Sequence, residues 1–236
     1  MTSIYLLGLV LLLLVLRQNI ITILVVLVSS IILLYSEERL YFMVEHMWRA
    51  LNHEVLLSIP LFILCGAIMT RGAISVRLIN IMRAATCAWP GGLGAACILS
   101  CAFFAAISGS SMVTLLAVGT ILYPALRKEG YSQQYSLGAI TSAGTLGVII
   151  PPSIPLIIYG ISTQTSITDL FLAGLIPGLL LTAALLGYSL VKNRKLPRHP
   201  FNPREFFTAV KVGIWSLLMP VILLGGIYSG HFTATE

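Results

Sequence analysis

Charged residues are scarce in this chain of 236 residues. Asp, Glu, Lys and Arg make up only 9% of it and hydrophobic residues 58%, and the mean hydropathy is +0.97. A soluble domain needs a polar surface that so few charges cannot provide, so the composition excludes a soluble enzyme. A membrane span takes about 20 apolar residues. Charges are absent from four stretches of that length or more: 84–126, 130–168, 170–191 and 212–235.

Patterns for metal binding and catalysis are also lacking. The four cysteines show no CxxC spacing and have no histidine nearby, so they predict neither a metal site nor a disulfide framework. Gly109-Ser-Ser could form half of a nucleophile elbow, but no histidine pairs with a spaced acid to act as its base. His46 and His53 are interpreted as part of a solvated helical face. We therefore predict that the chain is not an enzyme and holds no organic cofactor.

The basic residues that are present indicate topology. Lys and Arg number 14 against eight acidic residues, which gives a net charge of +6, and six of the 14 lie between Lys192 and Lys211. In a soluble protein such a cluster could bind nucleic acid. In a protein embedded in a lipid bilayer, it instead marks the cytoplasmic side by the positive-inside rule. We predict a multi-pass membrane protein without a nucleic-acid partner.

The first third of the chain alternates apolar and amphipathic segments. Residues 4–35 form either one long tilted helix or two short ones, and we favour two with a turn at Arg17, because a lone arginine in lipid is costly. Residues 37–54 are amphipathic and predict an external interfacial helix. A short span over 56–69 then leads to a second amphipathic stretch, 71–83, on the cytoplasmic side.

Two points inside the uncharged runs are poorly suited to helix. The run 84–126 is too long for one span, and Ile107-Ser-Gly-Ser-Ser111 lies in its middle, so we expect two helices that meet at this tip. They form either a re-entrant hairpin with both ends on the basic side or two ordinary spans with an external loop. The next run must break near Pro151-Pro152, because two prolines remove two backbone donors. Broken backbone at membrane depth is tolerated where it is buried in protein or lines a polar cavity.

Both points offer carbonyl and hydroxyl oxygens, which suit a dehydrated Na⁺. The alternative is that the small residues only permit close helix packing, which does not account for Pro151-Pro152. After the break, Asp169 is the only acid between 130 and 191. It could relay protons, but we favour a cap for the helix that follows. That helix should be a conventional span to Val191, and another span is expected from about Val212 to Tyr228.

Five motifs, taken together and in this order, resemble one family. They are Ile59-Pro-Leu-Phe-Ile-Leu-Cys-Gly-Ala-Ile-Met69, Pro90-Gly-Gly-Leu93, Ile107-Ser-Gly-Ser-Ser111, Gly144-Thr-Leu-Gly-Val-Ile-Ile-Pro-Pro-Ser153 and Ala173-Gly-Leu-Ile-Pro-Gly178. From about Ile59 to Glu236 the chain resembles the large membrane subunit of a tripartite ATP-independent periplasmic (TRAP) transporter. The N-terminal part matches less well, since Arg17-Gln-Asn19 replaces the Gly-x-Pro often found after the first apolar segment.

The resemblance implies both a fold and a function. The fold would be an all-α integral membrane fold of the elevator type, with a re-entrant helical hairpin and a Pro-Pro broken helix in one of two inverted repeats. The function would be sodium-coupled import of small organic acids across the bacterial inner membrane. Na⁺ would be the coupling ion. The partners would be a small membrane subunit and a periplasmic binding protein that delivers the substrate.

The resemblance also implies site residues. The positions that match the family's first sodium site are Ser108, Ser110, Gly147, Ile150 and Pro152, some of them acting through backbone carbonyls. The positions that match the substrate pocket are Ser110, Ser111 and Ser166.

On the same basis we divide the chain into four parts and expect it to be an N-terminal half. The parts are 1–83, scaffold spans and interfacial helices; 84–168, the hairpin and broken helix of the transport domain; 169–228, further spans joined by a basic loop; and 229–236, the start of a second repeat. Only one hairpin and one Pro-Pro break occur, so a missing C-terminal half would carry the second sodium site and most substrate contacts. The alternatives are an inactive fragment, a membrane scaffold or channel subunit, or a homodimer that supplies both repeats.

Overall fold

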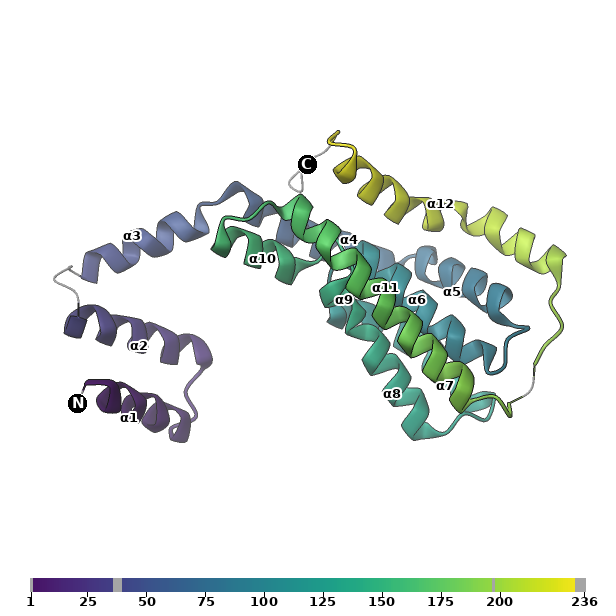
Figure 1. Ribbon diagram of the computed structural model, residues 1–236, viewed down its shortest axis with the longest axis horizontal. Coiled ribbons are helices and arrows are strands. Elements are labelled where there is room, and N and C mark those ends of the chain that lie inside the picture. Colours follow the sequence, from purple (N-terminus) through teal and green to yellow (C-terminus); the bar gives the residue numbers. More distant parts are fainter. Residues whose placement is uncertain (1, 36–39, 197, 232–236) are drawn as a thin grey trace. The chain divides into compact units, whose positions relative to one another are not determined.

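The computed structural model describes residues 2–35, 40–196 and 198–231, which are helical apart from turns and short connections (Figure 1). The contacts divide the chain into two compact units, 1–53 and 54–236. At least three of the described helical segments are long and apolar enough to cross a membrane: Gln133–Thr163, Ile167–Lys192 and Pro203–Tyr228. The fold expected from the sequence, an all-helical membrane protein, is confirmed at this level.

The first unit contains α1 (Thr2–Val15), α2 (Ile20–Tyr35) and α3 (Leu40–Leu51). Helices α1 and α2 contact each other, and the chain reverses between them at Arg17, which has φ 53°. The two-helix interpretation of 4–35 is therefore confirmed, with the turn where it was expected. Helix α3 lies within the predicted amphipathic segment 37–54, of which 37–39 are outside the described residues.

The second unit is built around α6. Its helices are η1 (Glu54–Leu57), α4 (Ser58–Arg71), α5 (Ala73–Thr86), α6 (Gly92–Ser108), α7 (Ser111–Lys128), α8 (Gln133–Gly144), α9 (Leu146–Ile149), α10 (Ile154–Thr163), α11 (Ile167–Lys192) and α12 (Pro203–Tyr228). Helix α6 contacts α4, α5, α7, α8, α9, α11 and α12. Most of its side chains are buried, and they are chiefly Gly, Ala, Ser and Cys, which allow helices to approach closely.

Both breaks predicted in the uncharged runs are present. The run 84–126 contains two helices that meet between Ser108 and Ser111. The run 130–168 is broken between Ile149 and Ile154, where the consecutive prolines lack donors for a helix. A further interruption is present at Thr145, between α8 and α9, directly after Gly144. The division into 1–83, 84–168, 169–228 and 229–236 stays a prediction.

Two predicted helix starts were wrong. Helix α12 begins at Pro203 instead of about Val212, because the Asn202 side chain accepts a hydrogen bond of 3.1 Å from the Arg204 N–H and proline suits the first helical position. The N-cap of α11 is Ser166, not Asp169: the Asp169 N–H donates to Ser166 Oγ at 3.3 Å. Asp169 lies in the first turn, where its charge complements the helix dipole.

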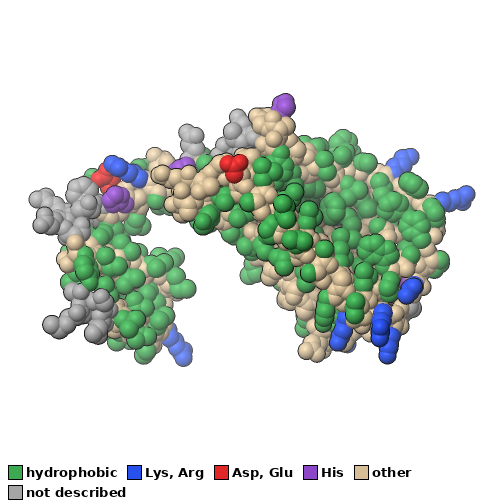
Figure 2. Space-filling view, viewed as in Figure 1, with side chains coloured by type: hydrophobic (Ala, Val, Ile, Leu, Met, Phe, Trp, Pro, Cys, Tyr) green, Lys and Arg blue, Asp and Glu red, His purple; other side chains and the backbone are tan. Residues whose placement is uncertain are grey.

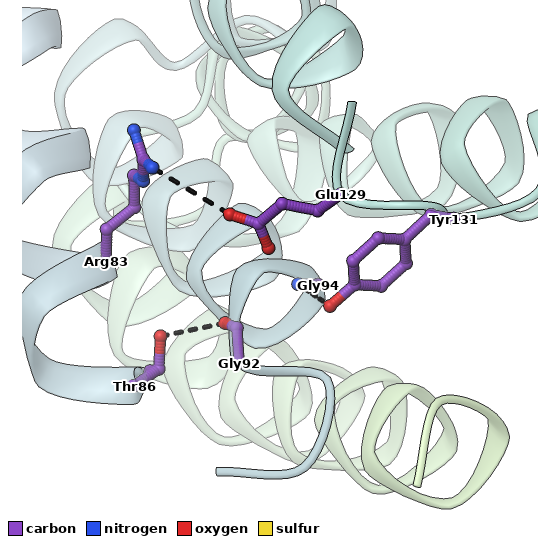
Figure 3. A network of polar contacts seen from close by, with 6 residues as sticks. All are labelled: Arg83, Thr86, Gly92, Gly94, Glu129 and Tyr131. Carbon is purple, nitrogen blue, oxygen red and sulfur yellow. Dashed lines mark hydrogen bonds and ion pairs between the residues drawn. The ribbon is translucent and has the colours of Figure 1, made fainter. Parts of the chain in front are cut away.

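The Lys and Arg side chains that Figure 2 shows on the second unit lie toward one end of it. Helices α7 and α11 both end there, with Arg127 and Lys128 in the last turn of one and Lys192 in that of the other. Figure 3 shows how polar contacts join the elements at this end. The Gly94 N–H, near the start of α6, donates to the Tyr131 hydroxyl at 3.2 Å. The base of the α6–α7 hairpin therefore lies at the basic end.

Candidate functional site

The tip of the α6–α7 hairpin is a tight reversal at Ser108–Ser111. Gly109 has φ +58°, a left-handed conformation that suits glycine, and its N–H donates to the Ala105 carbonyl at 3.0 Å and so closes the end of α6. Ser110 is extended, and α7 begins at Ser111. The chain therefore turns with two residues between the helices.

Side-chain oxygens hold this tip together. Ser108 is fully buried, and its Oγ lies 2.9 Å from Thr114 Oγ1 on α7. The same hydroxyl donates to the Ser110 carbonyl at 3.2 Å. The hydroxyl of Ser110, in contrast, takes part in no hydrogen bond among the described residues. The tip thus offers one free hydroxyl beside a buried pair.

The break at Ile150–Ser153 places carbonyl groups inside the protein. All four residues are buried. The Ser153 hydroxyl donates to the Val148 carbonyl near the end of α9. In the hydrogen bonds between described residues, the carbonyls of Ile150, Pro151 and Pro152 have no donor. Buried carbonyls without a donor are unusual in folded proteins, so these oxygens are available to a ligand.

Tip and break are in direct contact. The Ile154 N–H donates to the Gly109 carbonyl at 3.1 Å. A Cβ placed on Gly109 would lie 2.6 Å from the Pro152 oxygen, and one placed on Gly147 would lie 2.8 Å from the Ser110 carbonyl carbon. Both distances are too short for a real side chain, so glycine is required at both positions. We call this contact region the junction.

Four helix ends meet at the junction. Helices α6 and α9 end there, and α7 and α10 begin there. A helix C-terminus carries a partial negative charge and an N-terminus a partial positive charge. Among the described residues no donor reaches the carbonyls of Ile107 and Ser108, and the N–H groups of 111–113 reach no acceptor. The junction can therefore attract a cation at the ends of α6 and α9 and an anion at the start of α7.

Helix α11 shows how deep the junction lies. A Cβ on Gly174 would be 2.8 Å from the Ile149 oxygen, and one on Gly178 would be 2.7 Å from Ile150 Cγ1, so these two glycines pack on the break. At about 1.5 Å per residue, Gly174 is about 10 Å from the first residue of α11 and Gly178 about 21 Å from the last. The junction therefore lies well inside the length of an apolar helix.

The structure brings most of the predicted site residues together. Those at the junction are Ser108, Ser110, Ser111, Gly147, Ile150 and Pro152. Ser166 lies elsewhere: it is exposed and caps α11, and the whole of α10, about 15 Å of helix, separates it from the break.

The sequence reasoning missed three residues at the junction. Thr114 bonds Ser108, and it follows the tip by one helical turn, a spacing that could have revealed it. Gly174 and Gly178 form the small-xxx-small pattern that indicates close helix packing.

The family model described as "Tripartite ATP-independent periplasmic transporter, DctM component" matches residues 7–236. The chain belongs to this family of TRAP transporter proteins.

Curated members of the TRAP family also resemble the chain. The chain is 42% identical over 207 residues to the C4-dicarboxylate TRAP transporter large permease protein DctM of Pseudomonas aeruginosa, which covers 86% of this chain and 48% of that protein. It is 40% identical over 197 residues to the ectoine TRAP transporter large permease protein TeaC of Halomonas elongata. This match covers 82% of this chain and 46% of TeaC. It is 43% identical over 185 residues to the isethionate TRAP transporter permease protein DctMQ of Oleidesulfovibrio alaskensis. This match covers 77% of this chain and 29% of DctMQ.

This TRAP family chain spans about half the length, or less, of these curated relatives. The matched part is their N-terminal half. The relatives are named as transporter permeases, not as enzymes, and the channel or scaffold alternative is not favoured. Their names refer to chemically different solutes, so membership of the TRAP family does not by itself identify a substrate.

Proposed function

We propose that the junction is a Na⁺ site in a sodium-coupled TRAP transporter of the elevator type. The observation that carries the proposal is the set of buried carbonyls of 150–152 without donors, set against the hairpin tip. Na⁺ is a hard cation that is bound by oxygen atoms at broken helices in transporters. The proposed ligand positions are Ser108, Ser110, Gly147, Ile150 and Pro152. Ile150 would act through its carbonyl, because its hydrocarbon side chain has no atom that binds Na⁺ and packs against Gly178.

The substrate is proposed to be a small organic acid. A carboxylate would be attracted by the N–H groups at the start of α7 and by the hydroxyls of Ser110 and Ser111. The relatives' names include C4-dicarboxylate and isethionate, which are anions. Ser166 would take part only if the hydroxyl that now caps α11 were released.

The hairpin is proposed to be re-entrant from the cytoplasmic side of the bacterial inner membrane. Its base lies at the basic end of the unit, and its tip lies at the level of Gly174 and Gly178 in α11, which supports a tip buried at membrane depth. A cysteine-free background with single cysteines at Ser110 and Asn52 tests this topology. A reagent confined to the periplasm should modify position 52 much faster than position 110. Equal rates would contradict the deep hairpin.

The active transporter is proposed to need more than this chain. The curated relatives are about twice as long, and a substrate held by one half alone would lose hydration without enough compensating contacts. A second half, a small membrane subunit and a periplasmic binding protein would complete the assembly. Reconstitution with the two partner proteins should give uptake only when the second half is added. Sodium-driven uptake without it would favour a homodimer that supplies both repeats.

The sodium site is tested in a full-length permease that carries this segment, together with its partners. Ser110→Ala removes a hydroxyl that makes no internal hydrogen bond, so expression should persist while the half-saturating Na⁺ concentration rises about tenfold. Ser108→Ala should shift it in the same direction. Ser162→Ala, on an exposed hydroxyl of α10, is the matched control. Unchanged sodium titrations in both junction variants would leave only a packing role for these serines.

A further inference from the structure

A groove of about 960 Å³ opens at the basic end of the second unit, between α5 and the first turns of α12. Arg77 and Arg83 line it from α5, and Arg204 lines it from α12. The groove touches α6 only at its start, at Gly92 and Leu93, whereas the junction lies at the other end of α6, so this groove is a separate feature of the protein.

The charges in the groove are incompletely balanced. Arg83 points toward Glu129, at 3.9 Å (Figure 3). Arg77 and Arg204 form no ion pair within the described part of the chain. Glu205 and His199 also line the groove, so the lining carries three arginines against two carboxylates. A ligand with an anionic group would gain from the two unpaired arginines.

The remaining walls of the groove are of mixed polarity. Asn80, Asn202 and Thr208 provide polar groups, while Leu93 and Val212 are apolar. Beyond the groove, α12 exposes large apolar side chains: Phe207 is 68% exposed and Trp215 is 72% exposed. A ligand that fits this surface has a charged head and an apolar tail.

The groove also runs along the membrane-spanning direction of α12. A Cβ placed on Gly213 would lie 3.3 Å from Arg77 Cβ, and Gly213 is about 13 Å farther along α12 than Arg204. Arg77 and Arg204 therefore lie at two different depths along α12. Arg77 is the deeper of the two and lies beside the apolar surface of the helix. Long arginine side chains at such levels extend their charge toward the interface, where lipid headgroups lie.

We propose that this groove binds the phosphate headgroup of an anionic glycerophospholipid. The headgroup lies between Arg77 and Arg204, and an acyl chain follows the exposed apolar surface of α12. Basic pockets between membrane helices on the cytoplasmic side are suited to such headgroups. The bound lipid links α5 to α12, and so it stabilises the contact between these two helices.

The first test measures lipid binding by the full chain in an uncharged detergent. Phosphatidylglycerol is titrated while thermal unfolding is followed, with phosphatidylcholine and inorganic phosphate as separate arms. Arg77→Gln combined with Arg204→Gln should weaken the apparent affinity for phosphatidylglycerol about tenfold or more. Both arginines are exposed, so this variant should fold.

The matched control is Arg194→Gln combined with Arg198→Gln. These arginines follow α11 and carry the same charge, but they do not line the groove. The control should change the affinity by less than about threefold. An equal loss in both double variants would overturn the proposal, since it would indicate attraction to overall charge. Equal stabilisation by phosphatidylcholine, or stabilisation by inorganic phosphate with no further effect of the lipid, would overturn it too.

A second measurement uses a native side chain. Cys87 lines the groove and is half-buried, whereas Cys65 is half-buried on α4, away from it. Phosphatidylglycerol should slow maleimide modification of Cys87 and leave that of Cys65 unchanged, with the two peptides resolved by mass spectrometry. Slowing of both cysteines alike, or of neither, would argue against a lipid seated in the groove.

Discussion

Helices α2 and α6 are both strongly apolar, but α6 is enclosed by the other helices of its unit, whereas α2 is largely exposed within its own unit. In α6, 14 of the 17 residues are buried, whereas Ile23 is the only buried residue among the described side chains of α2. The difference follows side-chain size. Helix α2 consists mainly of Ile, Leu and Val, while α6 is rich in Gly, Ala, Ser and Cys. Hydropathy identifies membrane helices, but small residues identify those that pack inside the protein.

The largest effect is expected when one carbon atom is added in each of the two units, at a glycine that has a close neighbour and at a glycine that has none. Gly147→Ala places a Cβ 2.8 Å from the Ser110 carbonyl carbon, whereas Gly8→Ala in α1 meets nothing within 4 Å. We expect Gly147→Ala to destabilise the protein by about 3 kcal/mol and to abolish transport in a full-length permease. Gly8→Ala should be neutral or stabilising by about 0.5–1 kcal/mol. Unfolding in mild detergent measures both, and equal stability would refute the tight contact.

A smaller effect is expected when the side-chain sizes of the two helices are changed. Ala96 in α6 is fully buried, and Leu24 in α2 is 53% exposed. Ala96→Leu should cost about 2 kcal/mol through overpacking, while Leu24→Ala should change stability by less than about 0.5 kcal/mol. Thermal unfolding of the two variants side by side gives the comparison. A larger loss in Leu24→Ala would mean that α2, not α6, carries the tighter packing.

The smallest effect concerns pH at the base of the hairpin. Burial raises the pKa of Tyr131 to about 12, although the Gly94 N–H that donates to its hydroxyl lowers it. The usual pKa of tyrosine is about 10, so the folded state holds this proton more tightly than the unfolded state. The stability from Tyr131 is fully present below about pH 10 and is lost as the pH rises through about 12.

Tyr131→Phe should therefore flatten the alkaline loss of stability. It also removes the hydrogen bond from Gly94, so the variant should be less stable by about 1 kcal/mol at neutral pH. Tyr159→Phe, on the exposed face of α10, is the control. The free energy of unfolding is measured between pH 8 and pH 12. The values for wild type and Tyr131→Phe should converge as the pH rises, whereas the difference between wild type and the control should stay constant. Parallel curves for both would show that Tyr131 does not titrate differently on unfolding.

The sequence predicted the helix breaks because local chemistry determines them. Arg17 is a lone charge in an apolar stretch, Gly109 suits a left-handed turn, and Pro151-Pro152 cannot continue a helix. Each of these signals lies within a few residues. Helix α12 starts before the uncharged run that predicted it, because Asn202 and Pro203 are themselves a helix-start signal.

The contacts between distant segments were less accessible to the sequence. That the hairpin tip meets the Pro-Pro break came only from the family resemblance, because no local pattern pairs Gly109 with Pro152. The hydrogen bond of 2.6 Å between the hydroxyls of Tyr135 and Ser189 joins α8 to α11. No periodic pattern in the sequence indicates that these two residues meet.

The hydrogen bond from Ile154 to Gly109 also has a consequence for biosynthesis. A ribosome makes α6 and α7 before α9 and α10, so the hairpin tip is complete while its partner segment does not yet exist. Backbone N–H and C=O groups without hydrogen-bond partners have a high free-energy cost in lipid. We therefore expect the nascent hairpin to stay in a hydrated part of the insertion machinery until residue 154 has emerged. Membrane integration of α6 and α7 would then depend on a segment that is translated after them.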